Sequence, residues 1–264
     1  MDLSIIVFLV FSFGALFLGF ILEGGHLLAL FIGTAAIIVF GGTIGAVGLS
    51  FPMEEIKRLP KIIGVLFNYK PIDNYKITKQ FYELTTIARA EGILALEDAA
   101  GRNGIKHPLI TKGLRLIVDG VDTNHIYKSL VTDAENIDAR HEAGFAIFES
   151  AGGYSPTMGI IGTVMGLVHV LGNLSDPSTL GPKIAVAFIA TLYGVGTANL
   201  LWLPIATRLK NISEKESLSN QMVINALVAL QQGKHPKLVI DDMSAFLTQE
   251  EREKVLKELK LGDD

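Results

Sequence analysis

The sequence predicts an all-α integral membrane protein with four transmembrane helices and a helical cytoplasmic domain. Three observations predict this fold: a mean hydropathy of +0.41, four long stretches without a charged residue, and helical periodicity in the charged segments. Hydrophobic residues make up 49% of the 264 residues, which exceeds what a water-soluble domain of this size usually carries. We therefore expect much of the apolar surface to face lipid.

Two membrane hairpins account for the uncharged stretches. A helix needs roughly 20 apolar residues to cross the hydrocarbon layer, because lipid offers no partner for free backbone groups. The predicted spans are 3–22 and 27–51 in the hairpin 3–51, and 150–174 and 184–207 in the hairpin 150–207. Pro177, Gly181 and Pro182 are turn formers between the last two spans. No basic region precedes the first span, which is long for a signal peptide, so we expect it to be retained.

The distribution of basic residues predicts the orientation of these hairpins. All but one of the 23 lysines and arginines lie in 52–149 or 208–264, and the exception is Lys183. Cytoplasmic segments near span ends carry the excess of such residues. The sequence therefore predicts that both termini, the segment 52–149 and the C-terminal tail 208–264 lie in the cytoplasm.

The segments outside the spans have helical patterns. Ile77, Phe81, Leu84 and Ala88 recur at the spacing of one helix face, and Gly101 and Gly104 offer a stop. A second helix is expected to start near Asp122 or Thr123 and to continue without a breaker into the third span. The stretch 209–232 extends the fourth span. In the tail, Thr248 followed by Glu251 forms a capping-box pattern before a last amphipathic helix.

Several classes of function are not supported by the sequence. It contains no cysteine, which excludes disulfides and thiolate metal sites. We find no phosphate-binding loop, nucleophile elbow or paired-histidine metal motif, so we predict no enzyme, no catalytic residue, no metal site and no cofactor. The net charge of −4 and the spread of the basic residues argue against binding of nucleic acid.

Polar and small residues distinguish the third and fourth spans from plain anchors. Thr163 and Thr191 place hydroxyls among apolar residues, and such groups need a partner or a wet cavity in lipid. They are candidates to line an ion path, although helical threonines often bond to their own backbone. Gly159, Gly162 and Gly166 share one helix face and would let another helix approach closely, which is a structural role in most membrane proteins.

The four predicted spans contain no carboxylate. Glu149 lies at the edge of the third span, and no acidic residue lies deeper. Because an ion path that binds protons or sodium usually needs an acid within the membrane, a channel built from this chain must take one from a partner.

The third-span segment 152–167, Gly-Gly-Tyr-Ser-Pro-Thr-Met-Gly-Ile-Ile-Gly-Thr-Val-Met-Gly-Leu, resembles the signature of the MotA/TolQ/ExbB family. The fourth-span segments 190–194 and 198–204 agree with it. The segment 88–97, Ala-Arg-Ala-Glu-Gly-Ile-Leu-Ala-Leu-Glu, is similar to the stretch by which flagellar stators engage the rotor. The resemblance covers essentially the whole chain and favours the A subunits of flagellar stators, because the ExbB and TolQ branch usually has three spans.

The resemblance implies a ring of five A subunits in the bacterial inner membrane, around a dimer of B subunits whose helices supply the missing aspartate. The transported ion would be a proton, with sodium as the alternative. Thr163 and Thr191 would face the B helices along the ion path, and Pro156 and Pro204 would shape the helices whose movement produces torque. Segment 52–149 would be the rotor-interacting domain. Its Arg89 and Glu97 would contact the rotor switch protein.

Alternatives remain at this point. An ExbB/TolQ-type energiser of an outer-membrane system would share the third-span motif, a self-contained channel would need its own acid, and a polytopic enzyme would need a catalytic cluster. Arg89 and Glu97 could equally belong to a solvated helix face, and the prolines could be simple kinks. Eight residues correspond to about 80° around a continuous helix, so Arg89 and Glu97 share a face only if Gly92 does not break that helix.

Overall fold

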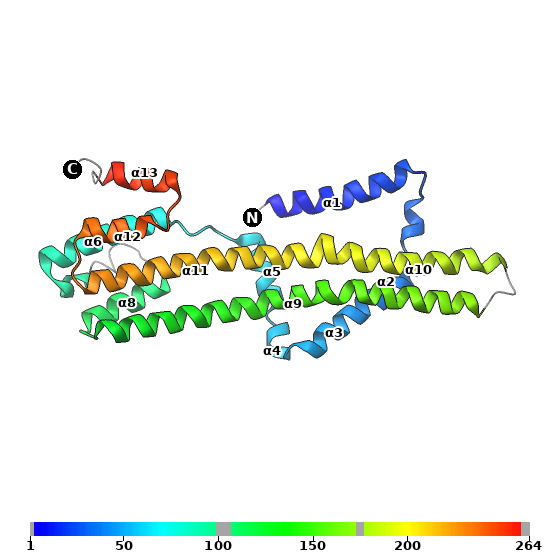
Figure 1. Ribbon diagram of the computed structural model, residues 1–264, viewed down its shortest axis with the longest axis horizontal. Helices are drawn as coiled ribbons and strands as arrows, with labels where there is room; N and C mark the ends of the chain where they lie inside the picture. The colour runs from blue at the N-terminus through cyan, green and yellow to red at the C-terminus, as the bar shows by residue number, and fades with distance from the viewer. Residues whose placement is uncertain (1–2, 99–106, 173–176, 260–264) are drawn as a thin grey trace. The chain divides into compact units, whose positions relative to one another are not determined.

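The computed structural model describes residues 3–98, 107–172 and 177–259, and all the elements within them are helices (Figure 1). This confirms the all-α prediction for the described residues. In chain order the elements are α1 (Leu3–Leu22), η1 (Leu27–Leu30), α2 (Gly33–Ala36), η2 (Ile37–Gly41), α3 (Gly42–Ser50), α4 (Met53–Ile56), α5 (Leu59–Asn68), α6 (Asn74–Glu91), η3 (Ile93–Ala95), α8 (Pro108–Val118), α9 (Thr123–Leu171), α10 (Pro177–Thr197), η4 (Ala198–Trp202), α11 (Leu203–Gln231), α12 (Pro236–Ser244) and α13 (Gln249–Glu258).

The chain forms two compact units. The first, here called the membrane unit, contains Met1–Tyr69 and His141–Asn211, and the second, here called the polar unit, contains Lys70–Arg140 and Ile212–Asp264. Helices α9 and α11 each contribute residues to both units. Four helical segments of the described chain are long and apolar enough to cross a membrane: Leu3–Leu22, Leu27–Ser50, a part of Thr123–Leu171, and a part of Leu180–Gln231.

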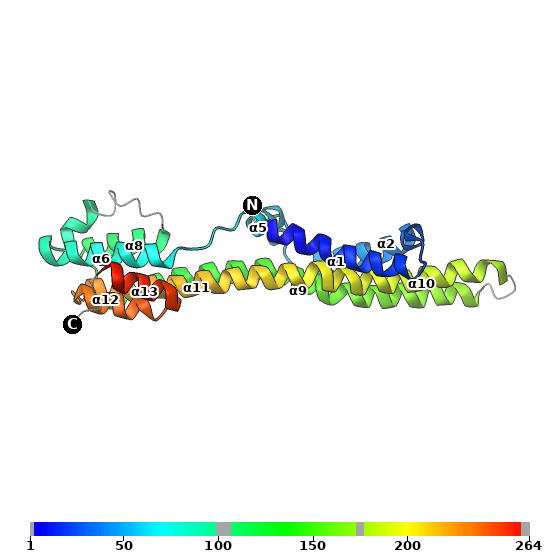
Figure 2. The same ribbon diagram turned by 90° about the horizontal axis from the view of Figure 1, so that it is seen from above.

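Small side chains form the contacts of α10 in the membrane unit, whereas larger side chains such as Leu66 and Phe148 pack elsewhere in it. In Figures 1 and 2, α10 runs beside the C-terminal part of α9. The segment α2–η2 packs on α10 and buries Ala35, Val39 and Ala190. Helix α1 has no buried residue in this single chain. The close approach of α9 and α10 sets the geometry of the candidate site.

The second span is not the continuous helix that the sequence predicts over 27–51. It starts with the 3₁₀ turn η1, breaks at Phe31 and Ile32, and resumes as α2, which continues through the π-helical η2 into α3. Ile32 has an extended backbone with φ −116° and ψ 106°. The stretch contains no charged residue and no proline, and Gly33, which follows the break, is one of five glycines in it, so no residue type sets the break apart.

The turn predicted between the third and fourth spans is shorter than expected. Helix α10 already begins at Pro177 and contains Pro182, both of which were expected in the turn. The start of the predicted turn, at Ser175, lies outside the described residues. Proline is tolerated at the first helical position, because that N–H has no helical partner. Pro182 also lies early in the helix. Because it has no N–H, only the carbonyl of Ser178, in the first turn, loses its helical hydrogen bond.

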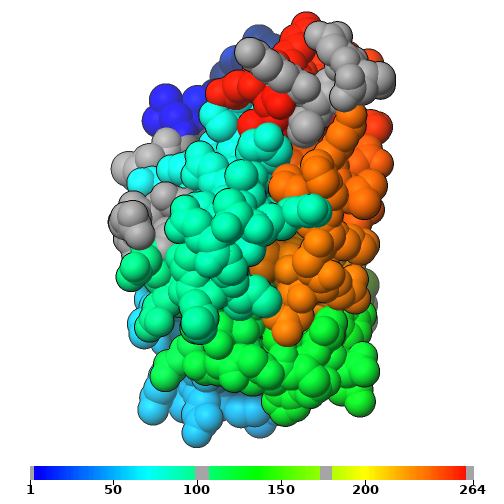
Figure 3. All heavy atoms as spheres, turned by 90° about the vertical axis from the view of Figure 1, so that its left-hand side faces the viewer, coloured from blue at the N-terminus to red at the C-terminus, as the bar shows by residue number. Residues whose placement is uncertain are grey.

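The polar unit has a conventional apolar core formed by α6, α8, α12 and α13 together with parts of α9 and α11. Ile77, Phe81 and Leu84 are buried in it, which confirms the predicted apolar face of α6. Helices α12 and α13 of the tail share this core, and Figure 3 shows α12 beside α6. The Nζ of Lys79 lies 2.5 Å from Oε1 of Glu258, which links α6 to α13. The C-terminal helices α12 and α13 are thus packed into the same unit as α6 and α8.

Most helix ends follow the sequence signals. Helix α9 begins at Thr123 as predicted, and α13 has the predicted capping box between Thr248 and Glu251. Helix α6, however, ends at Gly92, whose φ of +89° is a conformation that favours glycine. The stops predicted at Gly101 and Gly104 lie outside the described residues.

Candidate ion-path site

Glycines bring α9 and α10 into backbone contact. A Cβ placed on Gly159 would lie 2.9 Å from the carbonyl oxygen of Ala190, and one on Gly194 would lie 2.5 Å from that of Ser155. Gly162 and Gly166 also face α10, where a Cβ would lie 2.6 Å from Cβ of Ala190 and 2.8 Å from Cβ of Ala187, respectively. No larger residue fits at these positions without displacing the partner helix.

The structure places Thr163 on α9 next to Thr191 on α10, with their hydroxyls hydrogen-bonded. The Thr163 hydroxyl lies 3.1 Å from the carbonyl oxygen of Gly159 on its own helix and 3.0 Å from that of Ala187 on α10. A hydroxyl has one hydrogen and two lone pairs. When Thr163 donates to either carbonyl, Thr191 donates to Thr163, and the Thr191 oxygen keeps lone pairs for a further donor. Both side chains are partly accessible, so such a donor can reach them.

A second pair of hydroxyls lies on the same interface and was not singled out from the sequence. Ser155 is fully buried, and its hydroxyl lies 2.8 Å from that of Thr197 and donates to the carbonyl oxygen of Gly194 at 3.0 Å. Because each hydroxyl has one hydrogen, Thr197 then donates either to Ser155 or to the carbonyl oxygen of Tyr193 at 2.6 Å. Ser155 and Thr163 are eight residues apart, which is close to two helical turns. This spacing could have indicated from the sequence that both hydroxyls lie on a similar side of one helix.

The two candidate prolines lie in different surroundings. Pro156 is inside α9 and partly buried, and it removes the N–H that would bond to the carbonyl of Gly152. Pro204 is exposed at the second residue of α11, two residues after the π-helix η4 ends. Such irregular turns accommodate the hydrogen bond that a proline removes.

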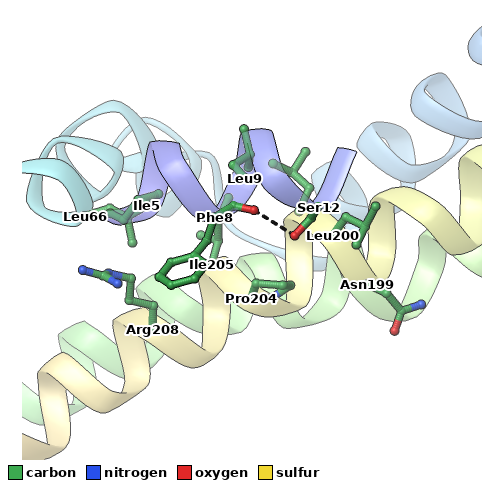
Figure 4. A pocket seen from close by; sticks show the side chains of 11 residues that line it. Ile5, Phe8, Leu9, Ser12, Leu66, Asn199, Leu200, Pro204, Ile205 and Arg208 are labelled. Carbon is green, nitrogen blue, oxygen red and sulfur yellow. Dashed lines mark hydrogen bonds between the residues drawn. The ribbon is translucent and has the colours of Figure 1, made fainter. Parts of the chain in front are cut away.

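A cavity of about 230 Å³ lies beside Pro204 (Figure 4). Leu200 and Pro204 line it from the fourth span, while Phe8 and Leu9 line it from α1, and Arg208 lies at one end. The side of α11 that carries Pro204 is therefore not filled by other side chains of this chain.

The structure does not bring Arg89 and Glu97 onto one helix face. Gly92 ends α6 between them, so the face that a continuous helix would provide is absent. Both side chains are exposed. Arg89 lines a surface hollow of about 500 Å³ together with Leu94 and Lys234, and Glu97 is not part of that lining. Leu94 is 76% exposed, which places a large apolar side chain beside Arg89.

One titratable group in the polar unit is perturbed by its surroundings. Burial lowers the pKa of His107 from its ordinary value of 6.5, because the charged imidazolium loses hydration. Its Nδ1 atom is buried. Among the described residues, no group of three or more His, Asp or Glu side chains is placed to hold a metal ion.

Known protein families match two regions of this chain. Residues 102–222 match the MotA/TolQ/ExbB proton channel family, and residues 6–92 match the N-terminal region of motility protein A. Motility protein A of Bacillus subtilis is 34% identical over 96% of this chain and 93% of its own length. The chemotaxis protein PomA of Vibrio alginolyticus is 32% identical over 96% of this chain and 98% of its own.

A solved structure agrees with these relatives. The flagellar MotAB stator complex from Bacillus subtilis contains a chain that matches with a TM-score of 0.86 and 34% identity, covering 94% of this chain and 98% of that one. The fold and the matched regions define a helical membrane subunit of the ion-channel type. The chain belongs to the MotA/TolQ/ExbB proton channel family, in its motility protein A branch. An ExbB/TolQ-type energiser is not favoured, because these relatives are motility and chemotaxis proteins.

Proposed function

We propose that this chain is the A subunit of a flagellar stator, which forms an ion channel with a B subunit and converts ion flow into torque on the flagellar rotor. The observation that carries the proposal is the Thr163–Thr191 hydroxyl pair at the α9–α10 interface, in a chain that is similar to stator subunits over nearly its whole length. The proposed assembly is a ring of five copies around two B subunits.

The ion is proposed to bind an aspartate of the B subunit, since the four spans of this chain contain no carboxylate. The hydroxyls of Thr163 and Thr191 face that aspartate in the proposal and pass the ion to it. A proton is the proposed ion, because hydroxyls that are hydrogen-bonded to one another can relay a proton, and sodium is the alternative. No resident cofactor takes part.

Torque is proposed to arise from two packings of α9 and α10 against the B helix. An ion that crosses the membrane releases about 2.3 kcal/mol per charge per 100 mV, which is enough to bias one discrete step. Binding and release of the ion at the aspartate favour one packing and then the other. Pro156 and Pro204 allow the helices to bend, and the cavity beside Pro204 provides the space for α11.

The rotor contact is proposed to lie at the end of α6. Arg89 at the end of α6 and Glu97 beyond Gly92 provide opposite charges, and Leu94 provides an exposed apolar group between them in the sequence. We also propose that the complex lies in the bacterial inner membrane with both termini in the cytoplasm, which is the orientation that the basic residues favour.

Complementation tests the proposal. The chain is expressed in a flagellated strain that lacks its own stator subunits, alone and together with the cognate B subunit. We expect swimming only when both are present. Swimming with this chain alone, or no swimming although both proteins are in the membrane and assembled, would contradict the assignment. Speed measured against external sodium and with a protonophore then identifies the ion.

A further inference from the structure

The break in the second span is bridged by a side chain from the fourth span. The Tyr193 hydroxyl accepts a hydrogen bond from the backbone N–H of Ile32 at 3.1 Å and donates one to the carbonyl oxygen of Leu30. These two backbone groups lie on either side of Phe31, where the helix is interrupted. In lipid there is no water to satisfy such groups, so the tyrosine replaces bonds that the break removes.

The inner end of the same span is bonded to the third span. The hydroxyls of Ser50 and Tyr154 lie 2.9 Å apart, and Ser50 also donates to the carbonyl oxygen of Ala46 at 2.8 Å. Since Ser50 has one hydroxyl hydrogen, Tyr154 is the donor to Ser50. One tyrosine from each helix of the candidate site therefore holds one end of the second span.

The positions of the two tyrosines relate them to the site. Tyr193 follows Thr191 by two residues on α10, and Tyr154 precedes Pro156 by two residues on α9. A shift of α10 against α9 therefore moves the two attachment points of the second span relative to each other. The ring of Tyr193 packs near that of Phe40, with centroids 6.1 Å apart, so its apolar contacts are separate from its hydroxyl bonds.

We propose that Tyr193 and Tyr154 are positioning residues, which attach the second span to the two ion-path helices and keep Thr191 in register with Thr163. Their role in torque rests on the proposed function. Their role in holding the second span does not, and it can be measured without ion flow.

The first experiment uses the absence of cysteine from the sequence. Ala35, directly after the break, is 0% exposed, so an Ala35→Cys variant of the assembled complex should react slowly with a small thiol reagent. Adding Tyr193→Phe removes two hydrogen bonds and keeps the ring. If each bond has the average strength found between membrane helices, the labelling rate should rise roughly eightfold.

Two matched variants test whether the effect is local. Tyr154→Phe should raise labelling of Val47→Cys at the inner end and leave Ala35→Cys unchanged. Tyr127→Phe, in the polar unit with a 48% exposed side chain, should change neither. Unchanged labelling of Ala35→Cys in the Tyr193→Phe background would overturn the proposal.

The second experiment separates positioning from stability. In single motors with a counted number of stator complexes, Tyr193→Phe should lower the speed per complex and alter its dependence on ion-motive force, with the number of complexes maintained. Faster labelling with unchanged speed per complex would reduce Tyr193 to a structural role and overturn the positioning claim. If the wild-type chain drives no motor at all, the proposed function fails, whereas the labelling results still decide whether Tyr193 holds the span.

Discussion

The α9–α10 interface of the membrane unit and the core of the polar unit are packed in opposite ways. In the membrane unit, α9 and α10 meet at glycine, alanine and hydroxyl side chains, so that their backbones touch. In the polar unit large side chains such as Phe81, Met222 and Leu227 fill the core. Water drives apolar groups together only outside the bilayer, whereas helices in lipid associate through close packing and hydrogen bonds. The α9–α10 interface should therefore be sensitive to added atoms and the core of the polar unit to lost ones.

The largest expected effect is on the polar unit. Leu227→Ala removes a fully buried side chain that packs against Gly113, and it should destabilise this unit by about 2–5 kcal/mol. Thermal unfolding of the purified complex, followed by circular dichroism, measures the loss. Leu238→Ala, at a position that is 57% exposed, is the control and should have little effect. Equal losses in both variants would contradict the distinction between core and surface.

Enlargement at the helix interface should have the next largest effect. A Cβ at Gly194 would lie 2.5 Å from a backbone carbonyl oxygen of α9, so Gly194→Ala should cost about 1–3 kcal/mol through separation of the helices. Assembly with the B subunit, measured by co-purification, should fall. Gly196→Ala has nothing within 4 Å and should assemble normally. Normal assembly of Gly194→Ala would show that the interface is less closely packed than described.

A smaller effect is expected at the end of α6. Gly92 has φ +89° and ψ 166°, a conformation that is almost exclusive to glycine, so Gly92→Ala should cost about 1–3 kcal/mol locally although there is open space around it. Hydrogen exchange of the segment after Gly92 should increase. Gly64→Ala, also in open space but inside helix α5, should not destabilise its helix. Unchanged exchange in Gly92→Ala would mean that the chain adopts another turn without cost.

The helix cap of α13 should contribute about 1 kcal/mol. In Thr248→Ala the N–H of Glu251 loses its side-chain partner, so the C-terminal helix should fray. Limited proteolysis of the tail reports the change. Thr248→Ser keeps the hydroxyl and should resist cleavage like the wild type, whereas equally fast cleavage of both variants would exclude capping as the cause.

The smallest effect is a pH dependence of the polar unit. The pKa of His107 is lower in the folded protein than its ordinary value of 6.5, so the unfolded chain binds more protons between the two values. The contribution of His107 to stability should therefore be fully present above about pH 6.5 and should be lost as the pH falls below that value. In His107→Gln this loss should be absent from unfolding curves measured between pH 5 and pH 8. The same pH dependence in wild type and variant would assign it to other groups.

The contrast between the units also explains what the sequence could predict. The four spans were predictable because length and absence of charge are local properties, and the starts of α9 and α13 carried local signals at Thr123 and Thr248. The break at Phe31 could not be predicted, because its stabilising partner Tyr193 is 161 residues from Ile32 in the chain. Thr163 and Thr191 were found as polar groups in lipid, but their mutual hydrogen bond depends on the glycine contacts between α9 and α10.

We propose that the hydroxyls between α9 and α10 form part of the ion path. The most direct measurement is the speed of single motors with a counted number of stator complexes, recorded against ion-motive force for wild type, Thr191→Val and the exposed control Thr207→Val. If the hydroxyls have this role, Thr191→Val lowers the speed per complex and changes its dependence on the ion, while Thr207→Val behaves as wild type. Identical curves per complex for Thr191→Val and wild type would contradict it.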